Sequence, residues 1–355
     1  MYRKIMDFLK AWKESDHRKP LILQGARQVG KTYSILEFGR THYDNVAYFN
    51  FETNPKLNET FAENISPDYL IPILSHIAGQ TIVRERTLIV FDEVQLCERA
   101  LTSLKYFCED APDYHIIVAG SLLGVAVNRA KFSFPVGKVD MKTLYPMDME
   151  EFMVALHEDA LVEQIKTCFE TDTPLPAALH DAAMGLYRQY LIVGGMPECV
   201  KQFAETRDYI LVRHTQDTIL ASYLNDVSKY NNLNEIKKTR LVYDNITVQL
   251  SRKNTRFQYK LIKKCGRASE FENAIEWLCL SGIVSRVYKV EQIRKPLENY
   301  HDMDAFKIYV SDLGLLCAKK DLVANDILYM VEELNDFKGG LAENYVNVQL
   351  SINGY

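Results

Sequence analysis

The sequence of 355 residues lacks any long apolar run. Its apolar stretches, such as Leu88–Phe91 and Ile116–Ala119, are far shorter than the roughly 20 residues that a membrane-spanning helix needs. Near the N-terminus, Asp7 and Lys10 introduce charge where a secretory signal would carry its apolar core. We therefore expect a cytoplasmic protein without a membrane partner.

Patterns typical of disulfide frameworks and zinc sites are also lacking. The seven cysteines are scattered, their number is odd and no two have CxxC spacing, so reduced thiols are the simplest interpretation. The eight histidines form no close cluster, which predicts that the chain has no zinc site. The net charge of −5 gives the whole molecule no bias toward nucleic acid, so any such contact needs a local basic patch.

Up to residue 148, short apolar runs alternate with segments of helical character. This alternation predicts an α/β domain with a parallel sheet covered by helices on both faces. Three helices are predicted, at Tyr33–Phe38, Tyr69–Ala78 and Ala100–Asp110. The predicted strands are Leu21–Gln24, Val46–Phe51, Leu88–Phe91, His115–Ala119 and Met141–Tyr145.

The first predicted strand leads into a phosphate-binding loop. The loop fits the pattern G-x-x-x-x-G-K-[ST] at every position, with the residues Gly25, Ala26, Arg27, Gln28, Val29, Gly30, Lys31 and Thr32. Glycines let the backbone curl around phosphates, and the following helix begins at the anion. We expect Lys31 to contact the phosphates of ATP and the Thr32 hydroxyl to contact Mg²⁺.

The predicted strand Leu88–Phe91 ends in two carboxylates, Asp92 and Glu93. We expect Asp92 to hold Mg²⁺ and Glu93 to polarise the attacking water, with Glu52 as an alternative base. The pair favours ATP hydrolysis, and the chain has no guanine-reading Asn-Lys-x-Asp. Asn50, at the end of the strand before, either orients Glu93 or forms hydrogen bonds at the start of a loop.

Ser121 follows the predicted strand His115–Ala119. Its hydroxyl either contacts the attacking water or the γ-phosphate, or caps the next helical turn. The sequence does not decide between the two.

After residue 148 the pattern becomes helical, which predicts a lid or adaptor over residues 149–235. Residues 236–300 show the order helix, basic helix, helix and strand that is typical of a winged helix. Residues 301–355 begin a further domain. Gly194–Pro197 combines backbone freedom with a rigid stop, which suits a hinge or turn between domains.

The segment from Arg252 to Arg267 is the best candidate for nucleic-acid contact. It carries seven basic residues and no acid, and two aromatic residues lie among them. The next predicted helix, Glu270–Leu280, contains three glutamates that would repel phosphates. A solvated basic face that packs on an acidic partner is therefore the alternative.

These motifs occur in an order that resembles bacterial and archaeal AAA-type ATPases with an uncharacterised C-terminal domain. The matching stretches are Leu23–Thr32, Phe91–Gln95, Ala119–Ser121, Tyr145–Met147, Gly194–Pro197 and Ser311–Leu316. The resemblance implies an AAA-like sheet, a helical lid, a winged-helix-like module and a nuclease-like C-terminal fold. It also implies that Ser121 senses the γ-phosphate and that subunits of a homo-oligomer share nucleotide sites.

The sequence departs from this family at two points. Lys138 stands where relatives often have an arginine, which puts a finger role toward a neighbouring subunit in doubt. The chain stops at Tyr355, where relatives continue, so we expect a truncated C-terminal domain and no nuclease activity.

Three functional hypotheses follow from these residues. The first, an Mg-dependent ATPase that acts as a conformational switch, is favoured by Glu93. The second is a DNA-binding regulator that uses ATP as a ligand, and the third is a scaffold that binds nucleotide without hydrolysing it.

Overall fold

The computed structural model describes residues 1–120, 134–230, 232–252 and 256–355. The chain divides into two compact units, and each is described by itself. The first, Arg3–Tyr145, is called the sheet unit below, and the second, Pro146–Tyr355 with Met1–Tyr2, is called the helical unit. The finer division into four parts remains a prediction.

The sheet unit contains a five-stranded parallel sheet in the order β2-β3-β4-β1-β5, which confirms the predicted fold class. The central strands β3 and β4 are buried along their whole length, in agreement with their largely apolar sequences. The strands are β1 (Leu21–Gln24), β2 (Asn45–Asn50), β3 (Thr87–Asp92), β4 (His115–Ala119) and β5 (Asp140–Thr143).

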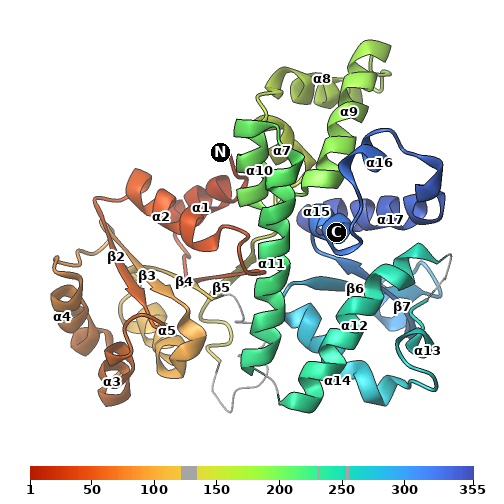
Figure 1. Ribbon diagram of the computed structural model, residues 1–355. Coiled ribbons are helices and arrows are strands. Elements are labelled where there is room, and N and C mark those ends of the chain that lie inside the picture. The colour runs from red at the N-terminus through yellow and green to blue at the C-terminus, as the bar shows by residue number, and fades with distance from the viewer. Residues whose placement is uncertain (121–133, 231, 253–255) are drawn as a thin grey trace. The chain divides into compact units, whose positions relative to one another are not determined.

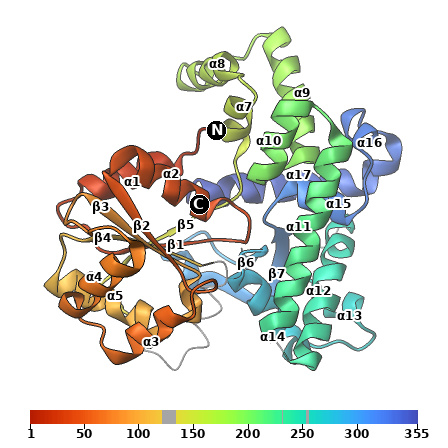
Figure 2. The same cartoon turned by 60° about the vertical axis from the view of Figure 1, so that its left-hand side comes forward.

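Helices cover both faces of this sheet (Figures 1 and 2). One face carries α1 (Ile5–Glu14) and α2 (Lys31–His42), and the other carries α3 (Lys56–Glu63), α4 (Pro67–Ala78) and α5 (Glu98–Asp110), with the turn η1 (Val94–Leu96) before α5. Phe61 on α3 and Phe91 on β3 meet edge to face at 5.6 Å in the core of the second face. Helices α1 and α3 were not predicted from the sequence.

The helical unit is built mainly from helices, and among the described residues none of these is both long and apolar enough to cross a bilayer. Its elements are α7 (Met149–Ala155), α8 (Asp159–Glu170), α9 (Ala177–Val193), α10 (Pro197–Thr206), α11 (Tyr209–Tyr230), α12 (Leu233–Ser251), α13 (Tyr259–Ile262), α14 (Ala268–Leu280), β6 (Val284–Val290), η2 (Leu297–Tyr300), β7 (His301–Val310), α15 (Leu313–Lys319), α16 (Ala324–Leu328), η3 (Glu332–Leu334) and α17 (Asn335–Ile352).

Two of the sequence motifs interlock inside the helical unit. The buried Asp312 caps α15 by accepting from the Leu315 amide at 2.8 Å and also accepts from the Gly195 amide at 2.6 Å. A Cβ at Gly194 would lie 2.3 Å from Asp312 Oδ1, so no larger residue fits there. Gly194–Pro197 is thus a packed turn between α9 and α10 within the helical unit, which is the second of its two predicted roles.

Helices α12, α13 and α14 precede the antiparallel hairpin β6-β7, so this region has the order of elements that predicted a winged helix. Among its described residues, however, the basic segment is helical only over the single turn of α13, which corrects the predicted basic helix. The helix stops because Lys263, directly after Ile262, is extended, with a φ of −153° and a ψ of 138°.

Candidate functional site

The phosphate-binding loop joins β1 to α2, and two glycines give it its path. Gly25 has a φ of 144°, and a Cβ there would lie 2.1 Å from the Leu144 carbonyl oxygen, so only glycine allows this close approach. Gly30 has a φ of 90° and caps α2, which begins at Lys31. The loop therefore delivers the chain directly to a helix N-terminus, a position that favours anions.

The Lys31 ammonium group lies inside this loop. The residue is 8% exposed, and its Nζ donates to the carbonyl oxygens of Gly25 at 2.9 Å and Ala26 at 2.8 Å. Backbone carbonyls therefore hold a positive charge in a sheltered position beside the N-terminus of α2. Such a charge can contact a phosphate at this loop with little screening by solvent.

Thr32, on the first turn of α2, meets Asp92 at the carboxyl end of β3. The Thr32 hydroxyl donates to Asp92 Oδ2 at 2.9 Å, while Oδ1 of the same carboxylate accepts from the Glu93 amide at 3.0 Å. Among the described residues, no group of three or more His, Cys, Asp or Glu side chains gathers around a common point. One hydroxyl and one carboxylate suit Mg²⁺, which takes oxygen ligands and keeps several waters.

Tyr48 on β2 was not singled out from the sequence. Its hydroxyl donates to Asp92 Oδ2 at 2.7 Å and accepts from the side-chain amide of Asn50 at 3.2 Å. Burial, together with the hydrogen bond to Asp92, raises the pKa of Tyr48 to about 12, so the phenol remains a donor at neutral pH. The sequence held no signal for this contact, because it depends on the pairing of β2 with β3.

Glu93 follows Asp92 with a φ of 51°, a left-handed conformation that turns the chain sharply at the end of β3. Its carboxylate accepts from the Gln95 side-chain amide.

Asn50 Oδ1 accepts from the amides of Glu52 at 2.9 Å and Thr53 at 3.0 Å. Asn50 therefore organises the loop after β2, which is the second of its two predicted roles.

Arg3 was also missed by the sequence analysis. It is 6% exposed, and its guanidinium group donates to the carbonyl oxygens of Val29 at 3.1 Å and Tyr145 at 2.8 Å. One end of this fork holds the phosphate-binding loop, and the other holds the chain after β5. Because these carbonyls lie 26 and 142 positions away in sequence, no local pattern could reveal the contacts.

Two further predicted residues can be placed or set aside. Ser121 lies outside the described residues. Lys138 forms an ion pair with Glu109 at 2.9 Å, near the end of α5, and this hydrogen bond raises the pKa of the Lys138 ammonium group. The charge of Lys138 is thus engaged within its own unit.

The basic segment borders helix α14, whose glutamates were expected to repel phosphates. Two of them are paired: Glu270 with Lys263 at 2.7 Å, and Glu272 with Arg286 and the Tyr259 hydroxyl. Repulsion from this helix is therefore weaker than its sequence indicates.

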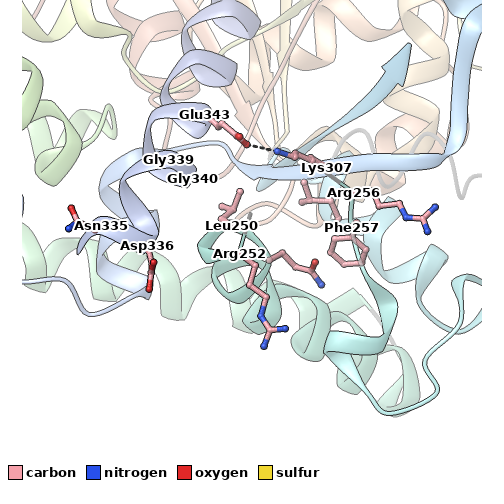
Figure 3. A pocket seen from close by; sticks show the side chains of 12 residues that line it. Leu250, Arg252, Arg256, Phe257, Lys307, Asn335, Asp336, Gly339, Gly340 and Glu343 are labelled. Atoms are coloured by element: carbon pink, nitrogen blue, oxygen red, sulfur yellow. Dashed lines mark hydrogen bonds and ion pairs between the residues drawn. The ribbon is translucent and has the colours of Figure 1, made fainter. Parts of the chain in front are cut away.

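Arg252 and Arg256 lie at a cavity of about 320 Å³ between the end of α12, β7 and the first turns of α17 (Figure 3). Gly339 and Gly340 form part of its wall, and Lys307 pairs with Glu343 at 2.7 Å beside them. In Figure 3 the guanidinium groups of Arg252 and Arg256 point in different directions, so they do not converge on one point.

Comparison with known proteins agrees with the geometry of the sheet unit. Residues 17–153 match the family model described as an AAA domain, and residues 184–326 match a domain of unknown function. The first match, with the loop and carboxylate geometry above, supports an AAA-type P-loop ATPase over these residues. No curated protein matches the chain.

Three solved structures with a distant likeness to this chain illustrate the comparison. ORC2 of Aeropyrum pernix, solved as ADPNP-ADP complexes, is 12% identical, with 99% of this chain and 95% of that chain covered and a TM-score of 0.46. ORC1 of Aeropyrum pernix in complex with DNA is 12% identical, with 90% and 91% covered and a TM-score of 0.32. The RuvB Holliday junction branch migration motor of Thermotoga maritima is 15% identical, with 80% and 88% covered and a TM-score of 0.34.

Proposed function

We propose that this protein binds ATP with Mg²⁺ at the edge formed by the phosphate-binding loop and β3, and that it hydrolyses the ATP. The single observation that carries this proposal is the hydrogen bond of 2.9 Å between Thr32 and Asp92, because it joins the start of α2 to the acidic end of β3. A chance match to the loop pattern would not bring these two groups together.

Each residue of the candidate site has a separate role in the proposed reaction. The amides of Gly25–Thr32 and the Lys31 ammonium group bind the phosphates of ATP. Thr32 and Asp92 would hold Mg²⁺, which when bound neutralises charge on the phosphates. Glu93 accepts a proton from the attacking water, and Ser121, by resemblance alone, contacts the γ-phosphate.

The test separates binding from chemistry with two substitutions. Lys31→Ala should weaken ATP binding and hydrolysis together, because Lys31 acts on the phosphates before reaction. Glu93→Gln keeps the size of the side chain but removes the base, so binding should survive while hydrolysis falls by a factor on the order of 10²–10⁴. Glu98→Gln, on the exposed start of α5, is the matched control and should hydrolyse ATP like the wild type.

Hydrolysis by Glu93→Gln at nearly the wild-type rate would contradict this assignment and leave Glu52 as the candidate base. Wild-type protein that binds ATP but releases no phosphate would instead favour the non-hydrolysing scaffold. Nucleotide binding and phosphate release, measured on the same preparations, distinguish these results.

We further propose that the ATPase is a switch whose helical region 149–235 responds to nucleotide, and that it works as a homo-oligomer. Both ideas rest on the resemblance stated above. If subunits share a site, specific activity should rise with protein concentration. Constant specific activity across a wide range, together with a monomeric mass, would refute the oligomer.

Nucleic-acid binding through Arg252–Arg267 is a second candidate function. It is favoured by the pairing of Glu270 and Glu272, which reduces the repulsion that these glutamates would exert on phosphates. Among the six basic side chains of this segment that the structure describes, only Lys263 forms an ion pair with an acidic side chain. Replacing Lys260, Lys263 and Lys264 by Glu should abolish binding to DNA, and replacing them by Arg should preserve it. Wild-type protein that shows no salt-sensitive binding to single-stranded or duplex DNA would exclude this function.

A further inference from the structure

Tyr48 is a large aromatic residue on β2 that does not pack in the core of the sheet unit. Its neighbours Ala47 and Phe49 are 0% and 2% exposed and belong to the core, whereas Tyr48 is 38% exposed. Side chains alternate along a strand, so Tyr48 and Asn50 share the face opposite to that core. The register pairs Asn50 with Asp92, so Tyr48 must reach along the strand to contact the carboxylate.

The Asp92 carboxylate receives three donors. Oδ1 accepts from the Glu93 amide, and Oδ2 accepts from both the Thr32 and the Tyr48 hydroxyl groups, at 2.9 Å and 2.7 Å. Without the phenol, only one flexible hydroxyl would hold Oδ2. A hydroxyl that donates to a carboxylate keeps its own lone pairs free for a cation, so a fixed Oδ2 also fixes the direction in which Thr32 can act as a ligand.

We propose that Tyr48 is a positioning residue for the metal site: its hydroxyl locks the rotation of the Asp92 carboxylate, and so keeps both Asp92 and Thr32 aligned for Mg²⁺. Asn50 supports this arrangement, because its side-chain amide donates to the Tyr48 oxygen and leaves the phenol proton for Asp92. The inference rests on the proposed binding of Mg-ATP, and concerns how the chain prepares that site.

The test is Tyr48→Phe, which removes one oxygen and leaves the ring. Binding of a fluorescent ATP analogue is measured in EDTA and then during titration with Mg²⁺. We expect binding in EDTA to match the wild type, and the half-saturating Mg²⁺ concentration to rise about tenfold, because a hydrogen bond to a charged group is lost. Asn50→Ala should shift the Mg²⁺ dependence in the same direction by a smaller factor.

Tyr69→Phe is a matched control, since the Tyr69 hydroxyl donates to the Glu63 carboxylate away from the site. It should leave the Mg²⁺ dependence unchanged. A shift below twofold in Tyr48→Phe, or an equal loss of binding in EDTA, would overturn the role of Tyr48. Wild-type protein without Mg²⁺-dependent nucleotide binding would instead refute the proposed function itself.

Discussion

Asp312 offers the sharpest test of how the helical unit is held together. Its carboxylate is buried and accepts from backbone amides on both sides, from Gly195 in the turn before α10 and from Leu315 in the first turn of α15. Asp312→Asn keeps the shape of the side chain but replaces one acceptor oxygen by an amide that can only donate. One backbone N–H then faces another donor in a buried site.

The magnitude follows from these contacts. A hydrogen bond to a charged group contributes about 1.5–3 kcal/mol, and a buried donor left without a partner costs about 1–3 kcal/mol. Reorientation of the turn recovers part of this loss. We therefore expect Asp312→Asn to lower the free energy of unfolding of the helical unit by about 2–4 kcal/mol at pH 7.

The pH dependence adds a second signature. Burial raises the pKa of Asp312 from its ordinary 3.8 to about 6, against the opposing effect of the backbone amides. The folded state thus holds a proton that the unfolded state has released between pH 3.8 and 6, so the Asp312 contribution to stability falls as pH rises through this window. Across this window, the contribution of Asp312 to the free energy of unfolding falls by about 3 kcal/mol. The gap between wild type and Asp312→Asn should widen as pH falls from 7 to 4.

The chain provides a convenient assay. It has two tryptophans, Trp12 in the sheet unit and Trp277 in the helical unit, and both are buried. In a Trp12→Phe background, urea unfolding followed by tryptophan fluorescence reports the helical unit alone. Asp208→Asn is the control, because Asp208 accepts from the Ile210 amide in an exposed position where Asn serves equally well. A loss below about 0.5 kcal/mol in Asp312→Asn would refute the reasoning.

Three further predictions concern the sheet unit. Gly25→Ala should abolish ATP binding, because its Cβ would lie 2.1 Å from a backbone oxygen, whereas Gly185→Ala in α9, where the Cβ meets no atom within 4 Å, should leave binding intact. Arg3→Met should weaken ATP binding about tenfold in equilibrium titrations, since the Val29 carbonyl loses a charged donor. Burial lowers the pKa of His115 from 6.5 to about 4. The free energy of unfolding of the sheet unit should therefore fall by up to about 3 kcal/mol between pH 6.5 and pH 4. In urea titrations, His115→Gln should reduce this pH dependence.

The strands β1, β3 and β4 were predictable because a parallel strand that is covered on both faces is largely apolar along its length. β1 and β4 begin and end at the predicted residues, and β2, β3 and β5 differ from the prediction by one or two residues at their ends. Helix α1 was missed although its buried residues, Ile5, Leu9 and Trp12, follow a helical period. Helix α3 has only two buried positions, Leu57 and Phe61, which is too thin a pattern to recognise.

Some residues of the candidate site could likewise be predicted from the sequence, and others could not. The loop residues and Asp92 could be predicted, because each belongs to a local motif with a chemical reason for its spacing. Tyr48 and Arg3 could not be predicted, because their partners come near only after β2 pairs with β3 and after the N-terminus folds onto the loop. The early end of α13 was also hidden, because no residue pattern marks the extended backbone at Lys263 that ends this helix.

These non-local contacts share one physical consequence. The phosphate-binding loop is held at Gly25 by the close approach of Leu144, at Val29 by Arg3, and through Thr32 by Asp92 and Tyr48. Each contact ties the loop to a different part of the sheet unit, so its shape is set before any phosphate binds. When a site is ordered before its ligand binds, little of the binding free energy is lost to ordering the loop. A substitution that removes any one of these contacts should therefore reduce the affinity of the protein for ATP or Mg²⁺, while the sheet unit stays folded.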